Sequence, residues 1–196
     1  MKGVFLDIET SGIDCDLHVA LEIGLSIYDL HNMECLCGYY SFIKCSEREF
    51  VFGSDPKSLK INGITLNDVL NAKDPTDVKN DIIDLFVMYG ITKTSSVFIC
   101  QNPSFDRMFF PQIIPIETQQ ELELPYHWLD LASMYFARSF DSIDNPIKPH
   151  DDSTPIKLSK DSIAKHLGIP PEQKPHRAFN GVQHLIACYK ALFKIQ

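Results

Sequence analysis

Two carboxylates, Asp7 and Glu9, stand one residue apart at the end of an apolar run. Residues i and i+2 of a β-strand point to the same face, so these two side chains are expected to lie side by side. Adjacent anions repel each other unless a cation holds them, and paired carboxylate oxygens suit Mg²⁺ or Mn²⁺. The pair suggests a divalent-cation site, although such a pair alone is more often a solvated strand edge.

Two further residues complete a chemical set. Asp106 falls in the first turn of an expected helix that follows an apolar strand, and His176 precedes the last expected helix. Two divalent ions about 4 Å apart can activate a water and stabilise a leaving oxygen. A histidine can remove the proton of that water. Together these residues predict metal-dependent phosphodiester chemistry. Singly, Asp106 also fits a helix-capping carboxylate, and His176 fits a surface residue after a proline.

The composition is that of an ordinary soluble globular protein, with 44% hydrophobic and 22% charged residues. A length of 196 residues predicts one domain, residues 1–196. The net charge of -8 gives no global attraction to nucleic acid, but a local basic patch is possible. One segment is locally basic and fits either such a patch or a solvated helix face; its charges are Lys157, Lys160, Lys165, Lys174 and Arg177 against Asp161 and Glu172.

The sequence carries no signal of export or of membrane insertion. The apolar run that starts at Gly3 is broken by Asp7, too soon for a signal-peptide core. None of the six cysteines forms a C-x-x-C pair, which argues against a zinc site. Reduced thiols in a cytoplasmic protein are the simplest interpretation.

The order of elements predicts how these residues are positioned. Residues rich in Ile, Leu, Tyr and Phe predict the strands, which we place at 3–9, 20–29, 34–44, 95–100 and 128–131. Helical spacing and capping residues predict the helices, which we place at 58–61, after Pro75, after Pro103, up to Arg138, from Ser159 to Gly168, and after Pro175. Residues 139–155, rich in Asp, Ser and Pro, predict a mobile loop.

This order predicts an α/β fold, with a mixed sheet flanked by helices. The loops that carry the carboxylates should then lie near strand ends, where open α/β sheets place their ligands. Glu22 lies within an apolar strand and is interpreted as structural, held by hydrogen bonds.

On these motifs the chain resembles the DnaQ-like 3′–5′ exonucleases of the DEDD superfamily, in the histidine-bearing (DEDDh) subgroup. That group includes the proofreading subunit of bacterial polymerase III, ribonuclease T and oligoribonuclease. The resemblance runs from about Val4 to Ala191 and rests on five segments, which are FLDIETSG, ALEIGLSIYD, QNPSFDRMFF, WLDLASMYFAR and HRAFNGVQHLIA. Gln101 stands where a histidine is often found, and Asp130 stands where the family commonly has an aspartate.

The resemblance implies a ribonuclease H-like fold with a five-stranded mixed sheet. It also implies a site with two Mg²⁺ or Mn²⁺ ions that releases nucleoside monophosphates from the 3′ ends of single-stranded DNA or RNA. Asp7, Glu9 and Asp106 match three of the four acidic ligands, and His176 matches the general base. The residues expected to meet the substrate are Thr10, Ser11, Asn102 and Phe105, the last with packing as its alternative role. A stand-alone protein and a homodimer of the oligoribonuclease type are both compatible with the sequence, and a polymerase or repair partner is not identified.

The chain departs from the family at the fourth acidic ligand. The aspartate expected five residues after His176 is replaced by Gly181. Glycine has no ligand atom, and near a helix start it is less stable than alanine by up to about 1 kcal/mol, with no packing gain expected. The glycine is either an introduced substitution, the mark of a weakened or inactive relative, or compensated by a water, by Asn180 or by a nearby side chain such as His184.

Two functions from different classes follow. The first is a metal-dependent 3′–5′ exonuclease, possible if the missing ligand is replaced. The second is a catalytically silent module that binds nucleic-acid ends or a protein through the same cleft.

Overall fold

The computed structural model describes residues 1–140 and 155–195, whose strands form one five-stranded sheet. The strand order is β3-β2-β1-β4-β5. β1 pairs antiparallel with β2 and parallel with β4, β2 pairs antiparallel with β3, and β4 pairs parallel with β5. The strands are β1 (Lys2–Thr10), β2 (Ala20–Asp29), β3 (Glu34–Phe42), β4 (Ser96–Cys100) and β5 (Trp128–Asp130). The predicted mixed sheet flanked by helices is confirmed.

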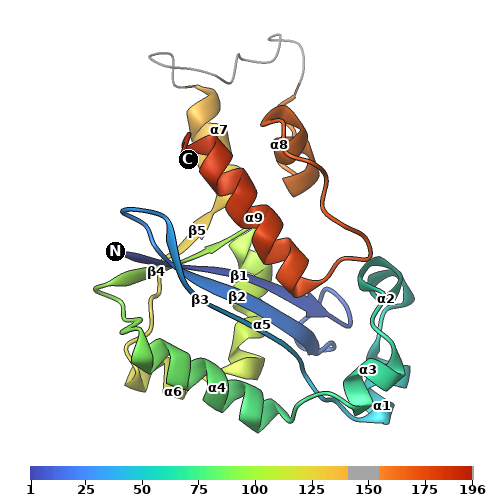
Figure 1. Cartoon of the computed structure of the whole chain (residues 1–196). Coiled ribbons are helices and arrows are strands. Elements are labelled where there is room, and N and C mark those ends of the chain that lie inside the picture. The colour runs from blue at the N-terminus through green and yellow to red at the C-terminus, as the bar shows by residue number, and fades with distance from the viewer. Residues whose placement is uncertain (141–154, 196) are drawn as a thin grey trace.

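The helices cover both faces of the sheet (Figure 1). One face packs against α4 (Pro75–Met88) and α5 (Pro103–Ile113), and the other packs against α7 (Leu131–Ser139), α8 (Lys160–His166) and α9 (Ala178–Leu192). The remaining helices are short; they are α1 (Glu47–Gly53), α2 (Pro56–Asn62), α3 (Leu66–Leu70) and α6 (Ile116–Glu121).

The alternation of β1 decides which side chains face α9. Val4, Leu6 and Ile8 belong to the core on the α4 and α5 side, whereas Phe5 belongs to the core beneath α9. The period of two then places Asp7 and Glu9 on the α9 side with Phe5. The prediction that the two carboxylates share a face is confirmed.

The predicted elements agree with the structure, and three short helices among the described residues were not predicted. β2 has the predicted bounds, and the helices after Pro75 and Pro103 are α4 and α5. The sequence interpretation missed α1, α3 and α6. Two of these carry a capping box, in which Ser46 pairs with Glu49 and Thr65 pairs with Asp68. The predicted mobile loop lies outside the described residues for positions 141–154, and its first residue, Ser139, ends α7.

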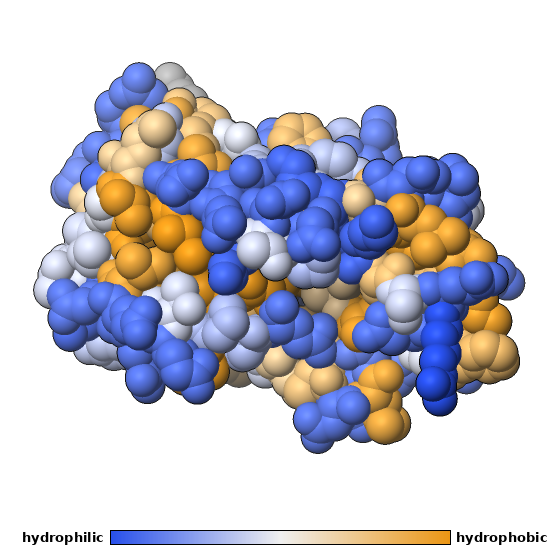
Figure 2. Space-filling view, turned by 90° about the horizontal axis from the view of Figure 1, so that it is seen from below, coloured by the Kyte–Doolittle hydropathy of each residue, from blue (hydrophilic) through white to orange (hydrophobic). Residues whose placement is uncertain are grey.

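The outer surface carries both hydrophilic and hydrophobic areas. Figure 2, seen from below Figure 1, shows a hydrophilic band that separates hydrophobic groups on the left and right. Exposed apolar side chains on α1 and α3, which lie at the lower right of Figure 1, include Val51, Phe52 and Leu70. Within the described parts of the chain, every helix is too short or too polar to cross a lipid bilayer.

The start of α9 lies directly against the backbone of β2. Gly24 is the strand partner of Asp7, and a Cβ at Gly24 would lie 2.6 Å from the carbonyl carbon of Ala178. Any side chain at position 24 would therefore push α9 away from the sheet. Because α9 carries Gly181 and follows His176, this contact fixes how the site is assembled.

We expect Gly24→Ala to lower the free energy of unfolding by about 1–3 kcal/mol, because the clash is with backbone that cannot rotate away. Gly38→Ala in β3 is the control, since a Cβ there would make only ordinary contacts at 3.7 Å or more. In urea unfolding, the free energy of unfolding of Gly38→Ala should stay within about 0.5 kcal/mol of the native value. Equal effects of the two substitutions would contradict the role given to Gly24.

Candidate active site

Asp7 lies at the centre of the candidate site, between α9 and the start of α8. Its side chain is 18% exposed, and its Oδ1 is 3.7 Å from Nζ of Lys160. Its Oδ2 faces Gly181 so closely that a Cβ there would lie 2.2 Å away. The carboxylate of Asp7 thus fills the space next to the position where the family has its fourth acidic residue.

Asp106 reaches the same strand from the opposite core. Its side chain is buried, and its Oδ1 accepts a hydrogen bond of 3.0 Å from the backbone N–H of Ile8. Ile8 lies beyond Phe5, the last residue of β1 that pairs with β4. Asp106 therefore accepts the hydrogen bond that a neighbouring strand would otherwise accept from Ile8. This places its carboxyl group beside the part of β1 that carries Asp7 and Glu9.

Asp7 repels both of the other predicted ligands. Burial, then the repulsion of Asp7, raises the pKa of Asp106 well above its ordinary value. Burial and the neighbouring carboxylates, Asp7 first, raise the pKa of Glu9 to about 9. Burial also raises the pKa of Asp7, against the opposing effect of Lys160. The site therefore makes the charged form of these carboxyl groups unfavourable in the absence of an added cation.

A buried ion pair that was not predicted from the sequence lies beside Asp7. Nζ of Lys160 is 2.8 Å from Oε2 of Glu172, and the two side chains are 13% and 1% exposed. Among the described residues Lys160 is the closest charge partner of Glu172, ahead of His176 and His184. Burial alone would lower the pKa of Lys160, but the carboxylates of Asp7 and Glu172 outweigh it and raise that pKa.

His176 lies beside this ion pair. Its Nδ1 is 3.5 Å from Oε1 of Glu172, its side chain is 30% exposed, and its backbone N–H donates to the carbonyl of Ile61. His184 approaches the site only through Glu172, at 3.9 Å, and its Nε2 donates to the carbonyl of Pro170. The segment before α9 therefore brings His176 to the same group of charges as Asp7.

Glu22 has the structural role expected of it. Its fully buried carboxylate accepts from Nε of Arg177 at 3.0 Å and from the backbone N–H of Ala178 at 3.3 Å. Arg177 also donates to the hydroxyl of Tyr40 and lies 4.3 Å from the ring centre of Phe42. This contact fastens the start of α9 to β2 and β3.

Of the residues expected to meet the substrate, two are buried and bonded within their own loop. The hydroxyl of Thr10 donates to the carbonyl of Gly12, and that of Ser11 accepts from the N–H of Val19. Phe105 is partly buried against the core and packs 5.1 Å from the ring of Phe109, as its alternative role predicts.

Asn102 is exposed in a left-handed conformation, and its N–H donates to Asp130. Asp130 also accepts from the N–H groups of Ala132 and Ser133 at the start of α7. This aspartate therefore braces the loop before α5. The assignment of Thr10, Ser11, Asn102 and Phe105 to substrate binding stays a prediction.

The structure gives Gly181 a packing reason, which corrects the expectation that glycine brings no packing gain there. Its backbone is not left-handed; instead, the carboxylate of Asp7 occupies the space of its missing side chain. An aspartate at position 181 would require Asp7 to rotate away. Asn180 is half-buried in the first turn of α9, and no hydrogen bond of its side chain to the carboxylates is found.

The acidic side chains of the site are of the type that binds a divalent cation, but position 181 lacks the donor that a second one would need. Five carboxylates gather here against the two cations Lys160 and Arg177, and these two already pair with Glu172 and Glu22. The carboxyl oxygens of Asp7, Glu9 and Asp106 are of the type that a divalent ion such as Mg²⁺ or Mn²⁺ prefers. As they stand, however, no three acidic, histidine or cysteine side chains among the described residues are arranged to hold a metal, and position 181 offers no donor.

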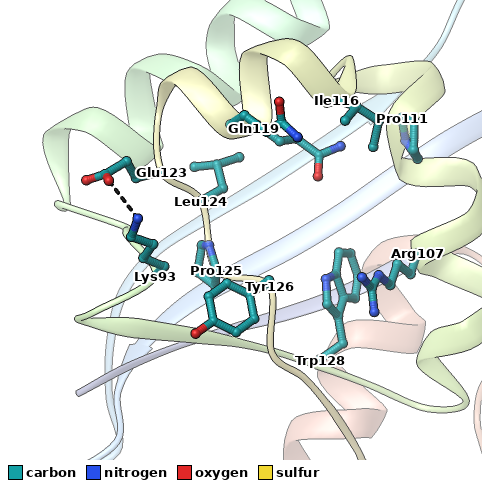
Figure 3. A pocket seen from close by; sticks show the side chains of 11 residues that line it. Lys93, Arg107, Pro111, Ile116, Gln119, Glu123, Leu124, Pro125, Tyr126 and Trp128 are labelled. Carbon is teal, nitrogen blue, oxygen red and sulfur yellow. Dashed lines mark ion pairs between the residues drawn. The ribbon is translucent and has the colours of Figure 1, made fainter.

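A hollow elsewhere on the surface contains none of the predicted site residues. It has a volume of about 460 Å³ and lies between α6, the start of β5 and the outer side of α5. Figure 3 shows Tyr126, Trp128 and Arg107 on its wall, with the ion pair of Lys93 and Glu123 at one end. Its lining is not part of the carboxylate site, so we place the candidate chemistry at Asp7.

The comparisons with known proteins support the fold and give no family by sequence. No protein-family model matches the chain, and no curated protein sequence matches it. Escherichia coli exonuclease I in complex with a dT13 oligonucleotide has a TM-score of 0.76 at 18% identity; the match covers 100% of this chain and 41% of exonuclease I. The zinc-ion-bound form of the exonuclease I complex with single-stranded DNA has a TM-score of 0.74 at 17% identity, with the same coverage.

Cell-death related nuclease 4 has a TM-score of 0.73 at 11% identity, and the match covers 98% of this chain and 64% of that nuclease. The chain thus spans about two fifths of exonuclease I and less than two thirds of the second nuclease. The resemblance to DnaQ-like exonucleases with a ribonuclease H-like fold is confirmed at the level of the fold.

We expect Arg177→Ala to lower the free energy of unfolding by about 2–3 kcal/mol, because it leaves the carboxylate of Glu22 buried without its cation. Adding Glu22→Gln to that variant should recover part of the loss, since an unpaired amide is less unfavourable than an unpaired charge. Urea unfolding of the two single variants and the double variant measures this coupling. Strictly additive losses would contradict the ion pair.

Glu9 should make stability depend on pH in the absence of divalent ions. With a pKa near 9 in the folded state and 4.5 as its ordinary value, the folded chain retains a proton that the unfolded chain releases. This contribution to stability is present at acidic pH and is lost as the pH rises toward 9. The free energy of unfolding of Glu9→Gln, compared with that of the native chain, should therefore rise by about 1 kcal/mol or more as the pH goes from about 5 to about 8.

Urea unfolding in a buffer with a chelator measures this difference. Glu34→Gln at an exposed position of β3 is the control and should follow the native chain. A constant difference between Glu9→Gln and the native chain across this pH range would show that Glu9 is ionised in the folded state.

Proposed function

We propose that this chain is a 3′–5′ exonuclease of the DEDDh type, which hydrolyses the terminal phosphodiester of single-stranded DNA or RNA. One observation carries the proposal: the carboxyl groups of Asp7, Glu9 and Asp106 are crowded together and buried beside His176, so that the pKa of each is raised. Such a cluster is unfavourable for stability and suits a site that binds a cation and a phosphate. The fold that the chain shares with exonuclease I, seen with an oligonucleotide, supports the same function.

In the proposed reaction, a water oxygen attacks the terminal phosphorus and the bond to the preceding 3′ oxygen breaks. The products are a nucleoside 5′-monophosphate and a strand shortened by one nucleotide, whose new 3′ oxygen takes a proton from solvent. A divalent ion, Mg²⁺ or Mn²⁺, held by Asp7, Glu9 and Asp106 would supply positive charge for the phosphate oxygens.

His176 is the proposed proton acceptor. Its Nδ1 faces Glu172, which fixes the ring and leaves Nε2 as the nitrogen that takes the proton from the attacking water. The partial exposure of the imidazole supports this role, because a substrate and a water can reach it.

Exposed apolar side chains near the site are candidates to meet the bases. Phe179 follows Arg177 at the start of α9, is 41% exposed and packs against Tyr40. Ile13 and Leu17 are more than 70% exposed in the loop after β1. Stacking on such surfaces tolerates any base, which suits an exonuclease that advances along a strand.

A second candidate function has its own observation. Gly181 provides no ligand, and Lys160 already pairs with Asp7, which is the arrangement expected of a silent module that binds 3′ ends. In that case oligonucleotides bind without being shortened. A homodimer and any protein partner stay predictions, as does the cytoplasmic location.

Hydrolysis of 5′-labelled single-stranded DNA and RNA with Mn²⁺, against a chelator control, tests the proposal. The native chain should shorten the strands stepwise from the 3′ end. His176→Gln should lower the rate by about 100-fold, since general-base catalysis contributes on this order. His31→Gln, at an exposed turn, is the matched control and should leave the rate unchanged. Binding without shortening of either polymer would establish the second candidate instead.

A further inference from the structure

We infer that the ammonium group of Lys160 is a fixed cation of the carboxylate site and occupies the place of a second divalent ion. The site then takes one divalent ion per chain. The inference rests on the proposed function, because it concerns the charge of the same site, and it gives Lys160 and Glu172 roles that the family resemblance does not imply.

The contacts of Lys160 are those of a bridging cation. Nζ lies 2.8 Å from Glu172 and 3.7 Å from Asp7, which come from segments separated by most of the chain. An ammonium group is a compact point charge with three donors, so it can serve two carboxylates at once. With a side chain only 13% exposed, this lysine differs from a solvated surface lysine.

The ammonium group of Lys160 and the position of the missing aspartate, Gly181, both lie next to the carboxylate of Asp7. Asp7 faces Lys160 with Oδ1 and Gly181 with Oδ2, so the added cation and the lost aspartate flank the same carboxylate. A second divalent ion beside Asp7 would find no donor at position 181 and would be repelled by the ammonium group. The glycine and the lysine therefore act in the same direction, each removing the need for a second ion.

The fold holds Lys160 in place from both sides. Lys160 is the first residue of α8, whose start is capped by Ser159. The preceding residue, Leu158, accepts a hydrogen bond of 3.0 Å from the side chain of Gln101 at the end of β4. On the other side, the carboxylate of Glu172 is 1% exposed and has Lys160 as its closest charge partner among the described residues. The lysine is thus anchored to the sheet edge that carries the predicted ligands.

The number of Mn²⁺ ions bound per chain, measured by titration calorimetry and by electron paramagnetic resonance, tests the inference. The native chain should bind one ion. Lys160→Met should bind a second ion, or bind it at least about tenfold more tightly than the native chain does, because a like charge has been removed. Lys165→Met, an exposed position on the same helix, is the matched control and should stay at one ion.

Two further variants guard against a loss of folding. Lys160→Gln retains a hydrogen-bond donor toward Glu172 and should also gain the second ion, whereas Lys160→Arg retains the charge and should stay at one. Far-UV circular dichroism shows whether each chain is folded. A purely structural role of Lys160 would lower stability without adding an ion.

Two ions on the native chain would overturn the inference, and so would no ion. Folded Lys160→Met and Lys160→Gln chains that both remain at one ion would overturn it as well. Hydrolysis of the labelled strands, measured in parallel, separates this result from the proposed function. A native chain that binds one ion and shortens no strand refutes the exonuclease while the assignment of Lys160 stands.

Discussion

The negative charge buried at the end of β1 is the constraint on which the surrounding structure depends. Removing a carboxylate from water is unfavourable by several kcal/mol unless a cation or hydrogen-bond donors replace the water. Each neighbouring element supplies one such replacement. The start of α8 supplies Lys160, the segment before α9 supplies Arg177, and the unpaired edge of β1 supplies the N–H of Ile8. Asp7, Glu9 and Asp106 remain less well compensated, and their pKa values stay raised. These three groups are therefore the candidates for binding a cation.

The close approach of α9 to the sheet is the second requirement, and two glycines make it possible. Gly24 admits the backbone of Ala178, and Gly181 admits the carboxylate of Asp7. The loss of an aspartate at position 181 is therefore not only a missing ligand. Restoring a side chain there would displace Asp7, so a simple return to the family's acidic residue conflicts with the packing of this chain.

The sequence predicted those features that depend on local periodicity. The period of two in β1 was sufficient to put Asp7 and Glu9 on one face, and the apolar content of 20–29 fixed the bounds of β2. The short helices α1 and α3 were missed, although their capping boxes are visible at Ser46 and Thr65. Their apolar patterns are too short to show a helical period.

The parts of the site that were missed depend on the path of the chain through space. The charges of Lys160 and Glu172 were counted as a basic segment, but their meeting with Asp7 joins residues more than 150 positions apart. The loop of Thr10 and Ser11 was expected to meet a substrate, and the sequence did not show that the two hydroxyls bond within that loop. Residue type alone does not tell a buried hydroxyl from an exposed one, because both satisfy the same donors and acceptors.

The charge of the site also constrains the two candidate functions in the same way. A terminal phosphate is an anion, and it approaches three crowded carboxyl groups, of which Asp7 has Lys160 and His176 as opposing charges. Hydrolysis and silent binding therefore both require an added cation, since the repulsion acts on the bound state as well as on the transition state. Cation dependence of binding does not by itself separate an exonuclease from a silent module. What separates them is whether His176, oriented by Glu172, has a water to deprotonate once the phosphate is in place.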